Sequence, residues 1–509
     1  MAEMHPYKKK ELIRRLSAYL GMTLGEADSN HVFDKTIKHP KITGIAGDVV
    51  EQSILGYPSD SDQRPDLIVD GVPTELKVTG LKRSKSNPDV FEAKEPMSIT
   101  AVSPHKIVYE EFYTSHFWQK LEHMLIVYYL YDSETTVKAA EYANFPIEGF
   151  DFHEFNDEDV EILRNDWTIV RDFIDMLQQK YPNYEEHYPR ISSELRPDLL
   201  YIDTAPKWPH PPRFRLKRSV VTTLWETCCG KQREKLDLDV VTYGEFDGLC
   251  HRIAEYYRYM TGEQILDSVG YPAKRINKSI MEPVVVSMFG GTSRKMADIE
   301  IFSKMGLVSK TIVLNCNGAR TEDTKFIPVD FDEIIDDSVS FEESSCYDHF
   351  YNGTFLFSIF REPYKPVAGK SVPLSECEFL GFKRISFDDA FVEVEVRRTW
   401  DRIRHLIWYN ELVDVIERRK DGTPIINPCG TVKSAPNFPK ASEGQVFLRG
   451  TSTDSTYKPI CINGVNMTFQ NYWVRGAYLV DLLEQTDYRK RKIASTLTFL
   501  GGCFAATNI

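Results

Sequence analysis

Two carboxylates and a lysine, Asp66, Glu75 and Lys77, lie within one short run of the chain, RPDLIVDGVPTELKVTG. Mg²⁺ is a hard cation that takes few protein ligands, typically one or two carboxylates together with water and phosphate oxygens. A metal held in this way can activate water and stabilise the charge that develops when a phosphodiester is hydrolysed. We therefore expect Asp66, Glu75 and the Leu76 carbonyl to bind Mg²⁺. We expect Lys77 to orient or deprotonate the attacking water, or to neutralise the phosphate.

A strand hairpin would position these side chains. Leu67–Val69 is predicted to be one strand, Asp70-Gly71 a tight turn, and Glu75–Val78 the return strand. Alternate residues of a strand point to the same face, so Glu75 and Lys77 should lie side by side. The motif alone is weak, because Glu92-Ala93-Lys94 has the same form. The alternative is an exposed hairpin whose charges are simply solvated.

Helices are expected on either side of this run. The spacing of apolar residues predicts one helix over residues 8–21 and another over 44–55, capped by Thr43 and ended by Gly56. Glu51 lies in the second helix, where it could help to bind a second metal or to position the first. Residues 166–177 are predicted to form a further amphipathic helix.

The net charge of −13 is unusual for a protein that binds DNA, so its distribution matters. Residues 132–198 hold 17 acidic and 6 basic residues, whereas residues 207–218 hold five basic residues and no acid. Such segregation suits a nucleic-acid-binding face, although both runs could also be ordinary solvated surface. No run approaches the length of a membrane span. The nine cysteines lack any CxxC pair, which predicts reduced thiols in a cytoplasmic protein, with no disulfide framework or zinc site.

The order of predicted elements recurs along the 509 residues. Residues 297–302 and 307–314 resemble a second hairpin, and a helix containing Trp400 is expected over residues 399–418. Asp66 precedes Trp167 by 101 positions, and Asp298 precedes Trp400 by 102. This spacing is the first sign of two copies of one domain.

Matching segments follow each tryptophan helix. RFRLKRSVVTTLWE at 213–226 aligns without gaps with NYWVRGAYLVDLLE at 471–484, so that Lys217 pairs with Arg475. We therefore expect two tandem domains, residues 1–231 and 232–509, each an α/β fold with a mixed central sheet flanked by helices.

The run from Gly47 to Lys82, which contains GDVVEQSILG and PTELKVTG, resembles the MutH family. It is most similar to the two-domain type II restriction endonucleases that cut GATC, and DWTIVRDFIDML and FRLKRSVVTTL also resemble segments of that family. The resemblance implies a PD-(D/E)xK nuclease fold with Mg²⁺ as cofactor. It implies that Asp66, Glu75 and Lys77 are catalytic, with Glu51 in support. It also marks Lys120, in FWQKLEHML, as an additional active-site lysine, although a surface lysine is the alternative.

The second copy departs from this pattern. It retains Asp298 and Lys310 but has Val308 in the place of Glu75, and Glu282 would match Glu51. Because valine cannot bind a metal, we expect this copy to be degenerate and to bind DNA without cutting it. The expected DNA-binding residues of the two copies are basic: Lys207, Arg215, Lys217, Arg218, Arg449, Lys458 and Arg475.

The sequence therefore predicts a type II restriction endonuclease of a bacterial cytoplasm, acting on double-stranded DNA at a palindrome that the resemblance implies is GATC. One alternative is a mismatch-repair nicking endonuclease of MutH type. Another is a sequence-specific DNA-binding protein that does not cleave. With one complete site, the chain is expected to be a monomer in solution and to dimerise or form a loop only on DNA.

Overall fold

The computed structural model describes residues 5–58, 64–84, 87–133, 137–206, 208–272, 280–320, 322–367, 371–427, 430–452, 454 and 456–485, so Lys207 lies outside the described residues. The chain divides into two compact units. Unit 1 comprises Met1–Tyr243 and Met296–Leu307, and unit 2 comprises Gly244–Lys295 and Val308–Ile509. The chain thus leaves unit 1 later than the expected boundary at residue 231, and it returns once. Within the described ranges, no helix is long and apolar enough to cross a membrane.

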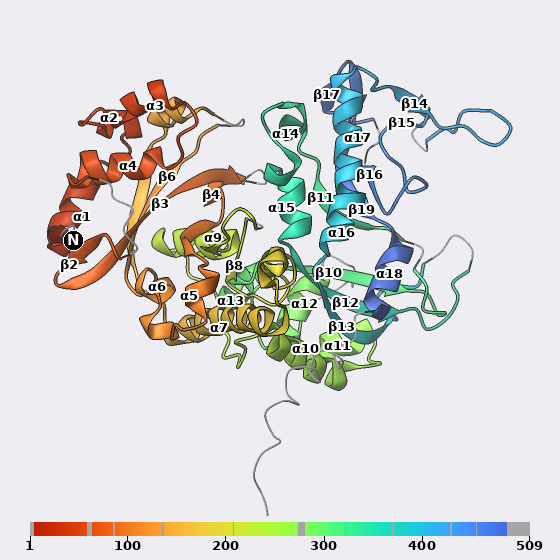
Figure 1. The fold of residues 1–509 in the computed structure, drawn as a ribbon. Helices are drawn as coiled ribbons and strands as arrows, with labels where there is room; N and C mark the ends of the chain where they lie inside the picture. Colours follow the sequence, from red (N-terminus) through yellow and green to blue (C-terminus); the bar gives the residue numbers. More distant parts are fainter. Residues whose placement is uncertain are drawn as a thin grey trace, which may run out of the picture. The chain divides into compact units, whose positions relative to one another are not determined.

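Unit 1 is built on a mixed sheet (Figure 1). Its strands, in spatial order, are β1 (His5–Tyr7), β2 (Leu67–Val69), β3 (Val72–Ser84), β6 (Met124–Leu130) and β7 (Ile147–His153), with β4 (Asn87–Ala93) also paired to β3. The β2–β3 pair is antiparallel and the β3–β6 pair is parallel. The predicted hairpin and the mixed character of the sheet are both confirmed.

One face of this sheet packs on the N-terminal helices. These are α1 (Lys9–Ser17), α2 (Leu24–Ala27), α3 (Lys35–Lys38) and α4 (Ile45–Val49), the last continued by a π-helical turn over Val50–Leu55. A shared apolar core includes Leu16, Val49, Leu76 and Val127. Gly56 ends the helix with a left-handed φ of 88°, as expected, but the predicted Thr43 cap is wrong. Gly44 precedes the helix with a φ of 81° and no side chain caps it.

The remaining helices of unit 1 surround a second sheet. Its strands are β5 (Met97–Ala101), β9 (Arg213–Leu216) and β8 (Ile202–Asp203), with β9 in the centre. The helices are α5 (Pro104–Ile107), α6 (His116–Gln119), α7 (Asp157–Lys180), α8 (Pro189–Ser193) and α9 (Arg218–Cys228). Helix α7 contains the helix predicted over 166–177. On α9, Trp225 packs against Tyr128 of β6, 5.0 Å between ring centroids, so α9 covers the other face of the main sheet.

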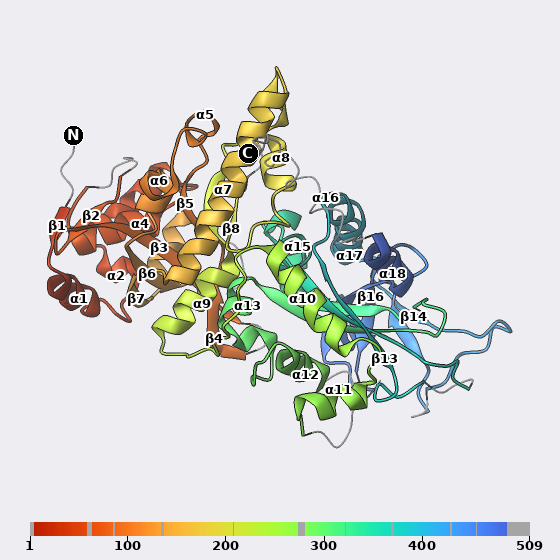
Figure 2. The same cartoon turned by 90° about the horizontal axis from the view of Figure 1, so that it is seen from below.

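The prediction of a strand over residues 297–302 is wrong. This segment forms a 3₁₀ turn, Met296–Asp298, and helix α13 (Glu300–Lys304), which lies beside α9 in unit 1 (Figure 2). Lys304 is only 4% exposed, and its ammonium lies 2.5 Å from Asp159 of α7 and 2.7 Å from Glu300. The Ser219 hydroxyl donates to the Lys304 carbonyl at 2.7 Å. The buried ion pair and the helical spacing of Glu300 and Lys304 outweigh the short alternating pattern.

Unit 2 contains two three-stranded sheets (Figure 1). The first has the order β10 (Leu307–Leu314), β12 (Thr354–Arg361), β13 (Glu378–Ile385), and the second β11 (Thr324–Pro328), β19 (Phe469–Val474), β16 (Val446–Thr451). Its helices are α10 (Tyr243–Tyr257), α11 (Gly262–Val269), α12 (Met281–Met288), α14 (Phe331–Ile335), α15 (Ser345–Tyr351), α16 (Asp389–Phe391), α17 (Arg397–Trp408) and α18 (Gly476–Gln485). Small hairpins are formed by β14 (Asp414–Ile416) with β15 (Ser434–Pro436) and by β17 (Ile460–Ile462) with β18 (Val465–Met467).

The helix predicted over residues 399–418 is shorter than expected. Helix α17 ends at Trp408, and Asn410 adopts a left-handed φ of 55° while the Glu411 N–H donates to the Leu406 carbonyl. This capping geometry stops the helix, since asparagine tolerates left-handed backbone better than most residues.

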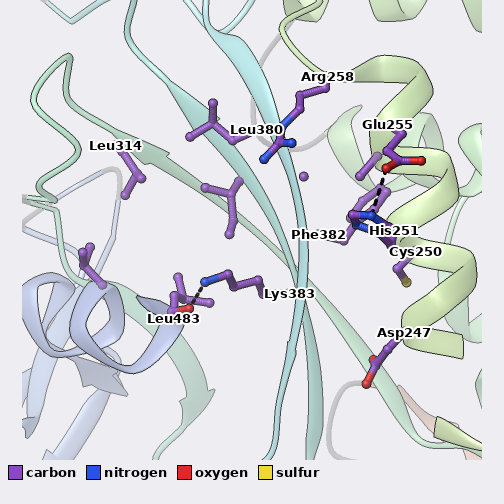
Figure 3. A pocket seen from close by; sticks show the side chains of 14 residues that line it. Asp247, Cys250, His251, Glu255, Arg258, Leu314, Leu380, Phe382, Lys383 and Leu483 are labelled. Carbon is purple, nitrogen blue, oxygen red and sulfur yellow. Dashed lines mark hydrogen bonds and ion pairs between the residues drawn. The ribbon is translucent and has the colours of Figure 1, made fainter. Parts of the chain in front are cut away.

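A cavity of about 290 Å³ lies in unit 2 between α10, β13 and α18 (Figure 3). Apolar side chains such as Leu380 and Phe382 form part of its wall, and the Lys383 ammonium donates to the Leu483 carbonyl at its edge. None of the residues that the sequence marks for catalysis or DNA binding lines this cavity.

Removal of the Lys304 ammonium tests how firmly residues 296–307 are held in unit 1. Lys304→Met leaves the Asp159 carboxylate buried without its cation, which should cost about 3–5 kcal/mol of unfolding free energy. Lys235→Met is the matched control, because Lys235 pairs with Glu300 while 74% exposed and should cost less than about 1 kcal/mol. Denaturant unfolding measures both, and equal costs would contradict the inferred role of the buried pair.

Candidate active site

The β2–β3 hairpin brings the two predicted carboxylates together. Asp70 and Gly71 have φ angles of 49° and 90°, as a two-residue hairpin turn of the favoured twist requires. Leu67 pairs with Thr74, which places Asp66 opposite Glu75 at the open end of the hairpin. The Leu76 N–H donates to Asp66 Oδ2 at 3.0 Å and holds that carboxylate in place.

Glu75 is bridged by two lysines. Its side chain is almost fully buried, the residue being 2% exposed, and the Lys77 ammonium donates to its Oε1 at 2.7 Å. The Lys120 ammonium donates to both carboxylate oxygens at 2.9 Å and to the Arg64 carbonyl at 3.3 Å. The structure therefore places Lys120 in contact with Glu75, although 45 positions separate them. Lys120 follows α6, whose first turn is capped by the Ser115 side chain.

Electrostatics distinguish this cluster from a solvated hairpin. Burial and the nearby charge of Glu75 raise the pKa of Asp66 to about 6, although the Leu76 N–H and the two lysines act in the opposite direction. Burial also raises the pKa of the Tyr57 phenol, and the charges of Glu51, Asp66 and Glu75 raise it further. Glu51, on the π-helical turn, therefore acts on the same tyrosine as the two hairpin carboxylates.

These residues fit a divalent cation. Asp66 and Glu75 repel each other in a buried setting, and a bound cation would relieve that repulsion. Two carboxylates with a main-chain carbonyl at Leu76 are the few hard ligands that Mg²⁺ takes from a protein. Among the described residues, no cluster of three or more His, Cys, Asp or Glu side chains is placed to hold a metal, so a richer ligand set is not found in that part of the chain.

The basic residues predicted to bind DNA have internal partners. Arg215 forms an ion pair with Asp203 at 2.6 Å, and Arg218 pairs with Glu92 at 2.8 Å. The Lys217 ammonium donates to the Leu199 carbonyl. Arg218 thus ties the start of α9 to β4, and Arg215 ties β9 to β8. None of these contacts involves Glu75. A DNA-binding role for these residues stays a prediction.

The basic residues predicted in unit 2 are similarly engaged. Arg449 pairs with Asp323 at 2.7 Å, and Lys458 lies 3.6 Å from Asp414. Arg475 follows β19, and its backbone N–H donates to the Gln445 carbonyl. Their contact with DNA is likewise a prediction.

Unit 2 repeats local details of the site. The Ser115 hydroxyl donates to the Phe112 carbonyl at 2.6 Å while capping α6, and Ser344 makes the same contact to Phe341 at 2.6 Å while capping α15. Five positions after these serines stand Lys120 and His349. Sequence reasoning missed His349, which an alignment on the F-x-x-S motif would have found.

The two aligned lysines, Lys77 and Lys310, each donate to a main-chain carbonyl of a neighbouring strand. The Lys77 ammonium donates to the Ile99 carbonyl of β5 at 3.4 Å, and the Lys310 ammonium donates to the Lys325 carbonyl of β11 at 3.0 Å. Val308 lies on β10 two residues before Lys310, as expected. Asp298 does not accompany them, because it ends the 3₁₀ turn in unit 1, so the predicted pairing of Asp298 with Lys310 in one hairpin is wrong.

Tyr57 and Arg64 were also missed by sequence reasoning. The Tyr57 hydroxyl is buried without a hydrogen-bond partner, and its ring stacks on His5 with 4.2 Å between centroids. The Arg64 carbonyl accepts the ammonium of Lys120. Any residue can supply a main-chain carbonyl, so no residue type in the sequence indicated the role of Arg64. Tyr57 directly follows Gly56, which ends the helix, and that position was a weak sign that its side chain lies near the site.

Comparisons with known proteins agree with this geometry. Residues 55–166 match the family model of the DNA mismatch repair enzyme MutH, and this range contains Asp66, Glu75, Lys77 and Lys120. The predicted resemblance to the MutH family is confirmed. The chain is also 22% identical to the type II restriction enzyme Sau3AI of Staphylococcus aureus over 503 residues, which cover 88% of this chain and 94% of that enzyme. The segment that the MutH model matches lies within unit 1, whereas the similarity to the restriction enzyme extends through both units.

The coupling between the two carboxylates can be measured directly in the metal-free protein. Glu75→Gln removes a negative charge beside Asp66 and frees Lys77 and Lys120, so it should lower the pKa of Asp66 from about 6 toward the usual value of 3.8. Carboxyl NMR titration reports this pKa. Glu11→Gln, on the surface helix α1, is the control and should leave it unchanged. An unchanged or higher pKa of Asp66 in Glu75→Gln would mean that Glu75 is not its neighbour.

Proposed function

We propose that this chain is a type II restriction endonuclease that uses Mg²⁺ to hydrolyse phosphodiester bonds of double-stranded DNA at the palindrome GATC. The observation that carries the proposal is the buried Glu75 carboxylate, opposite Asp66 and bridged by Lys77 and Lys120. Similarity to a type II restriction enzyme along both units supports the restriction role. The GATC site rests on that resemblance alone.

Each side chain has a part in the proposed reaction. Asp66, Glu75 and the Leu76 carbonyl would hold Mg²⁺, which supplies Lewis acidity and a water of lowered pKa. Glu75 and the Ile99 carbonyl hold the Lys77 side chain in place. From there its ammonium would orient the attacking water, or the neutral amine would take the proton of that water. Lys120 offsets the buried negative charge of Glu75 and would also neutralise charge on the phosphate. Glu51 supports the site from the preceding helix.

For unit 2 we propose a degenerate copy of the same domain that binds DNA without cutting it. The matched serine caps and the matched lysine contacts support common descent. Val308 stands where Glu75 supplies a carboxylate, so the copy lacks that ligand. One molecule then cuts one strand per binding event, and the basic residues Arg449, Lys458 and Arg475 serve DNA binding. The free chain is proposed to be a monomer in the cytoplasm.

A second candidate function is a mismatch-repair nicking endonuclease, which the match to the MutH model favours. That match covers residues 55–166 only, whereas the likeness to a restriction enzyme continues through unit 2. A restriction enzyme cleaves purified plasmid with Mg²⁺ alone. A repair nuclease of this type would require repair partners, so the same digestion separates the two functions.

Loss of a metal-binding carboxylate should abolish cleavage but not binding. We expect Glu75→Ala or Asp66→Ala to lower the cleavage rate by more than about 100-fold, as removal of a preorganised charge in an active site does. DNA binding should be retained, since less negative charge faces the phosphates. Ca²⁺ should support binding without turnover, because its looser coordination positions water poorly.

Plasmid digestion and gel-shift binding measure both effects. Glu11→Ala is the control carboxylate, because Glu11 lies on the surface helix α1, where it pairs with Arg15. Cleavage by Glu75→Ala at the wild-type rate would refute the assigned site.

The recognised sequence is read from the products. Mg²⁺ digestion of plasmid followed by sequencing of the ends should place every cut at GATC. Ends that share another motif would remove the GATC assignment and leave the nuclease assignment intact.

The second unit should make cleavage depend on the number of sites. If unit 2 binds another copy of the site and helps two molecules to meet across a DNA loop, a plasmid with two sites is cut faster than one with a single site. Time courses on otherwise identical plasmids test this, with linear fragments of the same sites as control. Equal rates would count against a role for unit 2 in bringing molecules together.

A further inference from the structure

A cavity of about 660 Å³ opens in unit 2 beside the strands that match the catalytic strands of unit 1. It lies against β10, β11, β16 and β19, which can be followed in Figure 1. Its charged lining consists of four cations and two carboxylates: Lys310, Arg320, Lys325, Arg449, Glu322 and Asp323. A cavity of this size is ample for a small polar ligand.

The two carboxylates of the lining offset only half of the positive charge around the cavity. Arg449 alone of the four cations has a carboxylate partner among the described residues, Asp323, at 2.7 Å. Lys310 reaches only the Lys325 carbonyl, at 3.0 Å. The cavity therefore contains two neighbouring lysines that lack ion pairs within the described ranges.

Arg320 adds a buried cation to the same wall. It is 6% exposed, and its guanidinium donates to the Val313 carbonyl at 3.2 Å and to the Thr324 hydroxyl at 3.0 Å. Its Nε has no hydrogen-bond partner. Burial lowers the pKa of Arg320, and the charges of Glu322 and Asp323 oppose this shift. A bound anion would offset more of the cost of burying the guanidinium.

The charge of this cavity follows from the substitution at Val308. In unit 1, Glu75 accepts the ammonium of Lys77. In unit 2, Val308 lies on the same face of the strand as Lys310 and offers no acceptor. Burial and the charge of Lys325 lower the pKa of Lys310 to about 8, and the charge of Glu282 opposes this shift. Lys310 thus lacks the carboxylate contact that Lys77 has.

We propose that this cavity is an anion site that binds a phosphate group, with Lys310 and Lys325 as the contacting cations and Arg320 as a buried charge behind them. Lysine and arginine are the usual partners of phosphate oxygens. A phosphate between the two lysines would supply the negative charge that Glu75 supplies in unit 1. The phosphate of a DNA backbone is the source we infer. That assignment, unlike the anion site itself, rests on the proposed function.

The anion site is tested without DNA or metal. Isothermal titration of the full chain with pyrophosphate in EDTA should show binding for the wild type and for Lys440→Met, a control at an exposed lysine of unit 2 outside the cavity. The double variant Lys310→Met/Lys325→Met should bind at least 10-fold more weakly. Equal affinities in the double variant and the control would overturn the proposal. Because no cleavage is measured, this result does not depend on the nuclease assignment.

Restoring the carboxylate provides a second test. Val308→Glu gives Lys310 an internal partner and should also weaken pyrophosphate binding at least 10-fold, whereas Val308→Gln, similar in size but uncharged, should weaken it less. Thermal unfolding confirms that each variant is folded. Tighter pyrophosphate binding by Val308→Glu than by Val308→Gln would contradict the charge argument.

The source of the phosphate is decided with a short duplex that lacks GATC. If the cavity binds the DNA backbone, the double lysine variant should lower the slope of log K against log salt by about two units relative to Lys440→Met. An unchanged slope together with lost pyrophosphate binding would support the anion site and overturn DNA as its source, leaving free phosphate or a nucleotide.

Discussion

A carboxylate buried between two ammonium groups is the interaction on which the candidate site depends. Glu75 is almost inaccessible to water, and an unpaired carboxylate there would be strongly destabilising. Lys77 comes from the same strand and Lys120 from the segment between α6 and β6. The ion-pair network therefore joins two separate parts of unit 1 at one point. The same charges leave Asp66 beside an unfavourable neighbour, which a cation can relieve.

The rest of unit 1 keeps this arrangement in register. The tight turn at Asp70-Gly71 sets Asp66 opposite Glu75, and the parallel pairing of β3 with β6 sets Glu75 beside Met124, four residues after Lys120. Helices α1, α2 and α4 bury the face of the sheet that bears Leu76. The neighbouring residues Glu75 and Lys77 must then point to the other face. Apolar packing on one face of the sheet thus directs the Glu75 and Lys77 side chains to the opposite face.

Unit 2 contains similar local contacts without a carboxylate beside the lysine. The serine caps and the lysine-to-carbonyl contact are retained, since they serve the backbone and do not depend on a metal. Val308 offers Lys310 no carboxylate at the position that aligns with Glu75. Burial and the charge of Lys310 lower the pKa of His349 to about 4, and the charge of Asp348 opposes this shift. The residue that aligns with Lys120 is therefore neutral at physiological pH. A histidine can lose its charge at little cost, whereas a lysine in that position would add to the repulsion.

Much of the fold and the centre of the site could be predicted from the sequence because their signals are local. The hairpin follows from a turn dipeptide between two short apolar runs, Glu75 and Lys77 share a face because strands alternate, and Gly56 ends a helix because it accepts left-handed backbone. Lys120 was found through resemblance to a family. No spacing rule in the sequence placed it on a carboxylate 45 residues away.

Only the tertiary structure decided which charges neutralise one another. It paired Arg215 with Asp203 and Arg218 with Glu92, and it carried residues 296–307 back into unit 1 through the buried contact of Lys304 with Asp159. The alternation of apolar and polar residues over 297–302 predicted a strand. The free energy of that local preference is small compared with that of a buried ion pair. The sequence by itself determined the elements and the facing of their side chains, because those depend on neighbours along the chain. Burial and ion pairing depend on neighbours in space, and they were settled only by the packing of the whole unit.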